Sequence, residues 1–273
     1  MPVKTVGIVA GAGRLPALAL RAAAHKGWKA AVVSVAGGPR PELAAEAASY
    51  EEIPLGQYGR VLAALTARGV RDVYLLGKLP KAAVANGGFD EAAQRVLARV
   101  ARRGDHAVIE AFVQDMAGRG LTVRSQLELL GDYVARPGWA AGRELTERER
   151  ADVDYGLEIA SLLADRVDAG QTVVVKEGVV LALEAAEGTD ETIRRGGRLG
   201  GPGAVVVKVK GRRPAHLELP AVGHDTVDAM AEAGAGVLAV EAGRVLLVDP
   251  EGMAARAREL GMAFIAVERS GNA

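Results

Sequence analysis

The chain has 273 residues, of which 49% are apolar and 25% charged, and its 34 acidic side chains balance 34 lysines and arginines. This balance leaves no basic field to attract nucleic acid, and the absence of cysteine excludes disulfides, thiol catalysis and thiolate metal sites. The composition is typical of a soluble cytoplasmic protein, and the length favours two domains.

The first half of the chain alternates strand and helix patterns. Strands are predicted at Thr5–Ala10, Lys29–Val35 and Asp72–Leu76, and helices at residues 15–27, 60–68, 90–103 and 106–119. This alternation favours an α/β fold with a Rossmann-like parallel sheet covered on both faces. Ligands of such sheets usually sit at the carboxyl ends of the strands.

Two loops at those strand ends carry candidate substrate-binding residues. Glycines after the first strand let the backbone approach a phosphate in front of a helix N-terminus, and a lysine after the third strand could neutralise one. The candidates are Gly11, Gly13, Leu15, Gly77 and Lys78. Pro16 stands where a dinucleotide-binding fingerprint needs its third glycine, which argues against NAD. A tight turn without a ligand and a plain surface lysine are the alternative interpretations.

The pattern weakens over residues 136–149, which we interpret as a linker between domains at residues 1–135 and 150–273. The capping box formed by Thr146 and Glu149 predicts a helix from Glu147 to about Val167. Strands are then predicted at Thr172–Lys176, Val179–Leu183, Ala204–Lys210, Val237–Val240, Val245–Val248 and Ala263–Val267, and helices at Thr226–Ala233 and Gly252–Leu260. The second domain is therefore expected to be mixed α/β.

An acidic turn follows the strand Val179–Leu183. Its candidate residues are Glu184, Glu187, Gly188, Thr189 and Asp190. Thr189 or Asp190 would cap a helix that begins near Glu191. Carboxylates at a strand end beside a helix N-terminus can hold a hard cation, or face the phosphates that it bridges. A solvated turn that only caps the helix is the alternative.

Five segments carry a family resemblance when their order and spacing are taken together. They are GIVAGAGRLP at Gly7–Pro16, LLGKLPK at Leu75–Lys81, the stretch Ala169–Gly197 with the acidic turn, VVVKVK at Val205–Lys210 and ELPAVGHDTV at Glu218–Val227. Over nearly its whole length the chain resembles the I-type UDP-2,3-diacylglucosamine pyrophosphatase family of lipid A biosynthesis.

The resemblance implies a nucleotide-binding-like N-terminal domain and a catalytic C-terminal domain. It implies Mg²⁺-dependent hydrolysis of UDP-2,3-diacylglucosamine to UMP and 2,3-diacylglucosamine 1-phosphate, with Mn²⁺ as the alternative cation. It further implies a homodimer that takes a UDP-linked glycolipid as its partner. The substrate would be delivered by peripheral contact with the inner face of the cytoplasmic membrane.

The resemblance also implies roles for individual residues. Glu218 stands at the family's catalytic aspartate, and His216 replaces an arginine. The implied catalytic residues are Glu218, Asp190 and Lys208, and the implied metal ligands are Glu218, Asp190 and Glu184. His216 joins Glu187, Gly188 and Thr189 as a substrate-binding residue. Because the replacements fall where the chemistry lies, two alternatives stay open: a hydrolase of another nucleotide diphosphate, and a nucleotide-binding regulatory module with weakened catalysis.

Overall fold

A computed structural model describes residues 3–78, 88–100, 105–167, 169–211 and 219–269, with only the backbone described at residues 105–106. The described residues form two compact units, residues 3–131 in the first and residues 132–211 with 219–269 in the second. Each unit has its own hydrophobic core. Residues 136–149, expected to be a linker, include strand β6 (Ala140–Gly142), which is part of a sheet of the second unit.

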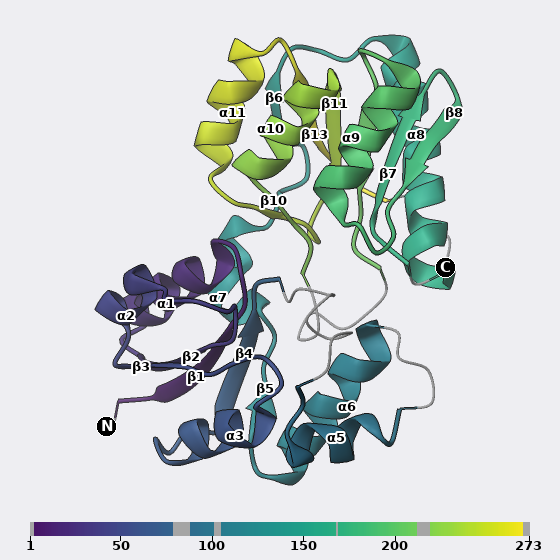
Figure 1. The fold of residues 1–273 in the computed structure, drawn as a ribbon. Coiled ribbons are helices and arrows are strands. Elements are labelled where there is room, and N and C mark those ends of the chain that lie inside the picture. Colours follow the sequence, from purple (N-terminus) through teal and green to yellow (C-terminus); the bar gives the residue numbers. More distant parts are fainter. Residues whose placement is uncertain (1–2, 79–87, 101–104, 168, 212–218, 270–273) are drawn as a thin grey trace. The chain divides into compact units, whose positions relative to one another are not determined.

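The described part of the first unit is built on a five-stranded parallel sheet in the order β3-β2-β1-β4-β5. Its strands are β1 (Thr5–Ala10), β2 (Lys29–Ser34), β3 (Ser49–Glu52), β4 (Asp72–Leu76) and β5 (Thr122–Val123). One face is covered by α1 (Leu15–His25), α2 (Pro41–Glu46) and α7 (Leu127–Leu130), and the other by α3 (Tyr58–Thr66), α5 (Glu91–Leu97) and α6 (Asp105–Gly118) (Figure 1). This arrangement confirms the predicted Rossmann-like fold.

A six-stranded mixed sheet in the order β6-β13-β11-β9-β7-β8 forms the centre of the described part of the second unit. The strands besides β6 are β7 (Thr172–Lys176), β8 (Val179–Leu183), β9 (Val205–Lys208), β11 (Val237–Glu241) and β13 (Ala263–Val267). Strands β9, β11 and β13 are parallel, whereas β7 is antiparallel to both β9 and β8. The predicted mixed α/β domain is therefore confirmed.

Helices cover both faces of this sheet (Figure 1). Helix α8 (Glu147–Leu162) continues as a π-helical turn at Leu163–Val167. It packs against one face of the sheet and shares a hydrophobic core with it. The other face is covered by α9 (Thr189–Gly200), α10 (His224–Ala233) and α11 (Pro250–Glu259), which share a second hydrophobic core with the sheet. Gly196 lets α9 lie close to the sheet, because a Cβ at this position would stand 2.6 Å from Val174 Cγ1.

The consecutive segments Val237–Val240 and Val245–Val248, which read in the sequence as two strands around a tight turn, do not pair with each other. The amides of Arg244 and Val245 both donate to the Glu241 carbonyl, so the chain turns away after β11 instead of reversing along it. Strand β12 (Leu246–Leu247) pairs in parallel with β10 (Ala221–Val222) in a separate two-stranded sheet. Tertiary pairing thus overrides a pattern that reads locally as a hairpin.

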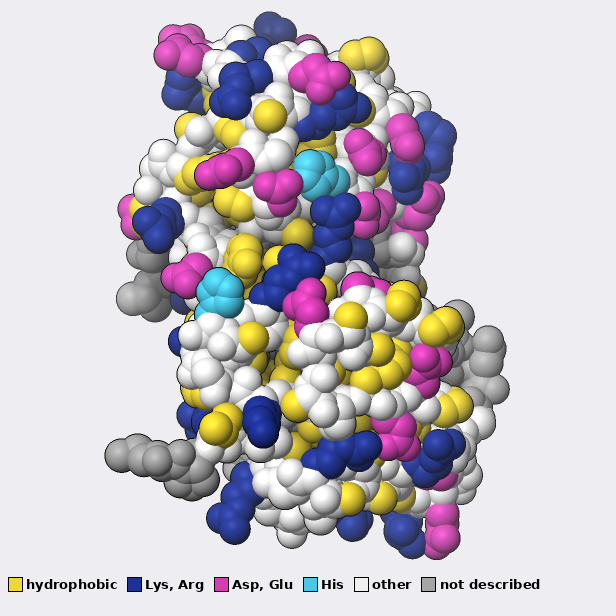
Figure 2. Space-filling model, turned by 90° about the vertical axis from the view of Figure 1, so that its left-hand side faces the viewer, with side chains coloured by type: hydrophobic (Ala, Val, Ile, Leu, Met, Phe, Trp, Pro, Cys, Tyr) yellow, Lys and Arg dark blue, Asp and Glu magenta, His cyan; other side chains and the backbone are white. Residues whose placement is uncertain are grey.

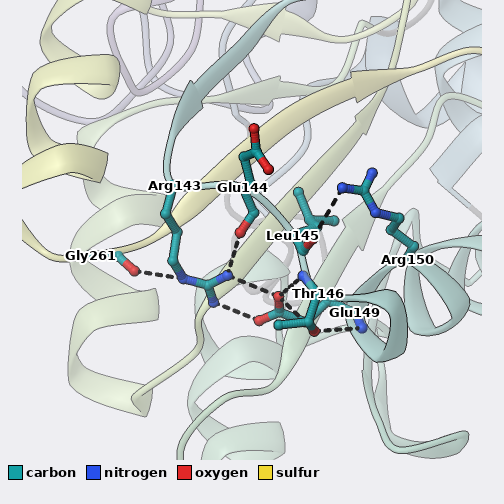
Figure 3. Close-up of polar contacts among 7 residues, drawn as sticks. All are labelled: Arg143, Glu144, Leu145, Thr146, Glu149, Arg150 and Gly261. Atoms are coloured by element: carbon teal, nitrogen blue, oxygen red, sulfur yellow. Dashed lines mark hydrogen bonds and ion pairs between the residues drawn. The ribbon is translucent and has the colours of Figure 1, made fainter.

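The segment between β6 and α8 is fixed by Arg143 (Figure 3). Its guanidinium donates from Nε to the Gly261 carbonyl at 2.9 Å and forms two bonds to the Glu149 carboxylate. Thr146 and Glu149 complete the predicted capping box of α8. Mainly because of the Arg143 bond, the pKa of Glu149 is lowered to about 2.

Positive and negative side chains are interspersed over the face shown in Figure 2, in keeping with the balanced charge of the chain. Among the described residues, no helix is both long enough and apolar enough to cross a bilayer.

Candidate active site

Four polar side chains converge at one edge of the six-stranded sheet. Lys208 ends β9, and Thr172, its partner in the register, begins the antiparallel neighbour β7. Glu184 directly follows β8, whose end meets the start of β7. Thr189 is the first residue of α9. Strand direction therefore brings residues from positions 172 to 208 together, and we call these four residues the lysine cluster.

Hydrogen bonds connect the members of the lysine cluster. The Lys208 Nζ donates to Thr189 Oγ1 and, at 3.4 Å, to Thr172 Oγ1. The Thr189 hydroxyl in turn donates to Glu184 Oε1 at 3.0 Å. The backbone amide of Gln171 donates to the other carboxylate oxygen of Glu184 at 3.1 Å. Thr189 thus links the ammonium group to the carboxylate.

The cluster is largely shielded from solvent, and its charges compensate one another. Lys208 is 6% exposed, Thr189 7% and Thr172 0%. Burial favours the neutral form of Glu184, but the Lys208 charge and the bonds from Thr172, Gln171 and Thr189 outweigh it, so the pKa of Glu184 lies below its ordinary value. The carboxylate therefore stays ionised and offsets the cost of burying the ammonium group.

This arrangement can stabilise negative charge on a phosphate. An ammonium group has three N–H donors, and the two threonine hydroxyls accept from two of them. A donor held in a fixed direction by buried partners needs little reorganisation when charge develops on a substrate oxygen. Lys208 is the residue predicted as catalytic, and its catalytic role stays a prediction.

Glu184, one of the three predicted metal ligands, is held in the lysine cluster. Glu184 accepts bonds at both of its oxygens and lies beside the Lys208 ammonium, which would repel a divalent cation. Asp190 lies one residue further along α9 than Thr189, and no described group of three acidic or histidine side chains could hold a metal ion. Glu218, the third predicted ligand, lies outside the described residues, as does His216.

The acidic turn divides its residues between two environments. Helix α9 begins at Thr189, two residues before the predicted start, because Gly188 at φ 84° is its N-cap and no side chain caps it. The expected cap from Thr189 or Asp190 is therefore wrong, and the Thr189 hydroxyl bonds within the lysine cluster. Glu187 instead accepts from Arg195 at 2.6 Å and from Thr192 at 3.2 Å, in an open hollow.

In the first unit, the glycine turn Gly11–Gly13 is bonded to the loop that follows β4. The amide of Gly11 donates to the Leu76 carbonyl at 2.7 Å, and the amide of Ala12 donates to the Lys78 carbonyl at 2.8 Å. The amide of Lys78 donates to the Ala12 carbonyl at 2.9 Å. The first two amides of the turn are thus bonded within the protein, and the role of the turn in holding a phosphate stays a prediction.

Close packing explains the glycines at this contact. A Cβ on Gly11 would stand 2.6 Å from the Lys78 carbonyl oxygen, and one on Gly77 would stand 2.5 Å from that of Ala12. Gly77 and Gly13 also have positive φ values, 89° and 91°. Leu15 begins α1 and is half-buried, whereas the Lys78 side chain is exposed.

Thr172 is a site residue that the sequence analysis missed. A threonine at the start of a strand carries no local signal, and only the antiparallel register of β7 with β9 places it against Lys208. Lys210 is buried as well. Its Nζ donates to the Gly211 carbonyl at 3.2 Å.

Two family models match the chain: the LpxI N-terminal domain over residues 5–133 and the LpxI C-terminal domain over residues 136–265. The chain belongs to the LpxI family. It is 29% identical to the UDP-2,3-diacylglucosamine pyrophosphatase LpxI of Caulobacter vibrioides, over 97% of this chain and 98% of that protein.

The match to this LpxI relative spans both units, so the lysine cluster and the glycine turn both lie in LpxI domains. Among solved structures, N5-carboxyaminoimidazole synthetase from Staphylococcus aureus is similar at a TM-score of 0.27 and 11% identity, over 64% of this chain and 41% of that one. A likeness this weak carries no argument about function.

Proposed function

We propose that this LpxI-family chain hydrolyses the pyrophosphate of UDP-2,3-diacylglucosamine, giving UMP and 2,3-diacylglucosamine 1-phosphate. Support comes from the Caulobacter relative, whose name states this activity and whose sequence aligns with nearly the whole chain. The observation that carries the proposal is the lysine cluster, in which buried hydroxyls and a carboxylate hold the Lys208 ammonium at a strand end.

In the proposed reaction, a water oxygen forms a bond to phosphorus and the bridging P–O bond breaks. One proton of the water passes to solvent, and the bridging oxygen stays on the other phosphorus and leaves as part of that phosphate. Negative charge grows on the phosphate oxygens along this path, and a preorganised cation lowers its energy. Lys208 supplies that cation, Thr189 and Thr172 orient it, and Glu184 keeps the cluster neutral before substrate binds.

Two parts of the proposal come from the family resemblance. Glu218 is the proposed catalytic carboxylate, and a Glu218→Ala variant is expected to lose turnover while its UDP affinity changes little, because the lost interaction belongs to the transition state. Mg²⁺, or Mn²⁺, is the proposed cation. Glu184 is not proposed as a ligand of this cation.

The test is incubation of the purified protein with UDP-2,3-diacylglucosamine, followed by phosphorus NMR, in buffer with Mg²⁺, with Mn²⁺ or with EDTA. The expected products are UMP and the sugar 1-phosphate in the presence of a divalent cation. Tight UDP binding without turnover under every condition would instead support the nucleotide-binding module. Turnover of another nucleotide diphosphate, but not of this lipid, would support the other hydrolase.

A further inference from the structure

Arg40 is bonded to the backbone of the glycine turn. It precedes α2, and its Nη1 donates to the Gly11 carbonyl and its Nη2 to the Gly13 carbonyl, each at 2.9 Å. The side chain crosses from the loop after β2 to the loop after β1, and 18% of it is exposed. One guanidinium therefore holds both ends of the turn.

Arg40 is itself held in place. Its Nε forms a bond and ion pair with Glu42 Oε1, and its backbone amide donates to the Tyr50 hydroxyl at 3.0 Å. Mainly because of the bond from Arg40, the pKa of Glu42 lies below its ordinary value. Since Glu42 balances the charge, the guanidinium is suited to orienting the turn rather than to binding an anion directly.

The two carbonyl bonds fix the direction of the peptide groups. In a trans peptide, the C=O and the following N–H point in opposite directions. Because the Gly11 carbonyl accepts from Arg40, the Ala12 amide points in the opposite direction and donates to the Lys78 carbonyl. With the Gly13 carbonyl on Arg40, the amide of Arg14 points away from the guanidinium at the N-terminus of α1, where an anion is favoured.

Two buried polar atoms at the same edge of the sheet point independently to a ligand. Ser34, 3% exposed, stands in register with Ala10, the residue before the turn. Gln126, 5% exposed, donates from Nε2 to the Leu75 carbonyl at 2.7 Å, just before the loop bonded to the turn. Among the described residues, Ser34 Oγ and Gln126 Oε1 are buried without a hydrogen-bond partner, and a polar ligand would supply one.

We propose that Arg40 is a positioning residue for nucleotide binding: it holds the Gly11–Gly13 turn in the orientation that receives the phosphates of the UDP portion of the substrate. This inference rests on the proposed function and extends it to the first unit. Arg40 does not touch the reacting atoms, so its loss weakens binding and leaves the chemical step unchanged.

The experiment compares Arg40→Ala and Arg40→Lys with a control, Arg21→Ala, which removes an exposed ion pair between α1 and Glu46. UDP affinity is measured by calorimetry, and KM and kcat with UDP-2,3-diacylglucosamine. Arg40→Ala is expected to raise the Kd for UDP and KM about tenfold and to leave kcat within about twofold. Arg40→Lys keeps the charge but not the planar fork, so an intermediate loss of affinity is expected.

A structural role alone would lower the melting temperature without a selective rise in KM. If Arg40→Ala fails to fold, Glu42→Gln loosens the same guanidinium, and a smaller rise in the Kd for UDP of about threefold is expected. UDP affinity and KM equal to those of the control would overturn the inference while leaving the proposed function intact. Failure of the wild-type protein to bind UDP or turn over the lipid would overturn both.

Discussion

The Thr189 hydroxyl donates a 3.0 Å hydrogen bond to Glu184 Oε1 at the first turn of α9. The same hydroxyl accepts from Lys208, so a neutral side chain connects a buried cation to a half-buried anion. Thr189→Val keeps the shape but removes this connection. This variant is expected to lower kcat about tenfold and the free energy of unfolding by about 1–3 kcal/mol, because the Lys208 ammonium and the Glu184 carboxylate lose a hydrogen-bond partner. Thr189→Ser should retain most of both, as measured by steady-state kinetics and urea unfolding.

Glu184→Gln tests the assignment of this carboxylate to Lys208. Removing the charge leaves a buried ammonium uncompensated and is expected to lower stability by about 3–5 kcal/mol at pH 7. The pKa of Glu184 lies below its ordinary value in the folded state. The contribution of its charge to the free energy of unfolding is therefore present above the pKa of Glu184 in the unfolded chain. It is lost as the pH falls through the lower pKa of Glu184 in the folded protein. Thermal unfolding at pH 7 and at lower pH should show the variant and wild type converging in acid.

A metal ligand would behave differently from a partner of Lys208. If Glu184 held the cation, Glu184→Gln would raise the Mg²⁺ concentration needed for half-maximal activity at least tenfold while leaving apo-protein stability nearly unchanged. That pattern would contradict our assignment.

The contact between the glycine turn and the loop after β4 predicts a selective cost at Gly77. Gly77→Ala introduces a Cβ at φ 89° and 2.5 Å from the Ala12 carbonyl oxygen, and we expect a loss of about 2–4 kcal/mol. Gly88→Ala is the matched control: its φ is 88°, and apart from its chain neighbours no described residue has an atom within 4 Å of the added Cβ, so only the strain of about 1 kcal/mol is expected. Equal losses in urea unfolding would show that the loop contact is unimportant.

The Arg143–Glu149 pair gives a prediction in acid. The folded pKa of Glu149 is about 2 against 4.5 for the free side chain. Because the folded value is depressed, the contribution is complete above about pH 4.5 and declines as the pH falls toward 2. Glu149→Gln should cost about 1–2 kcal/mol at pH 7 and little near pH 2, since a cap and a partly exposed ion pair are lost. Arg148→Gln, which removes an exposed ion pair to Glu177, should stay within about 0.5 kcal/mol of wild type at both pH values.

The sequence predicts the longer elements well because their apolar runs are sharply bounded. Strands β1, β4, β7, β8 and β13 have the predicted limits, and the capping box at Thr146 starts α8 where expected. Short strands such as β3, β5 and β6 were not predicted, since they exist through pairing with neighbours rather than through local pattern.

The candidate site was predicted only in part. A strand-end lysine and an acidic turn are visible in the sequence, but their mutual distance depends on the register of β7, β8 and β9. That register also brings Glu184, predicted as a metal ligand, beside Lys208, where it accepts from Thr189 and Gln171. Arg40 was missed for the same reason, because its bonds to the glycine turn span 27 and 29 residues.

The most direct measurement is the single-turnover rate of UDP-2,3-diacylglucosamine hydrolysis by Lys208→Met at saturating substrate. The Lys208→Met, Glu184→Gln double variant removes both charges of the lysine cluster and controls for stability. Lys176→Met controls for loss of a lysine from the same sheet, since Lys176 donates to a backbone carbonyl. Our account predicts a rate at least about a hundredfold below wild type in both variants that lack Lys208, and a rate within about twofold of wild type for Lys176→Met. A folded Lys208→Met protein that hydrolyses the substrate at the wild-type rate would contradict it.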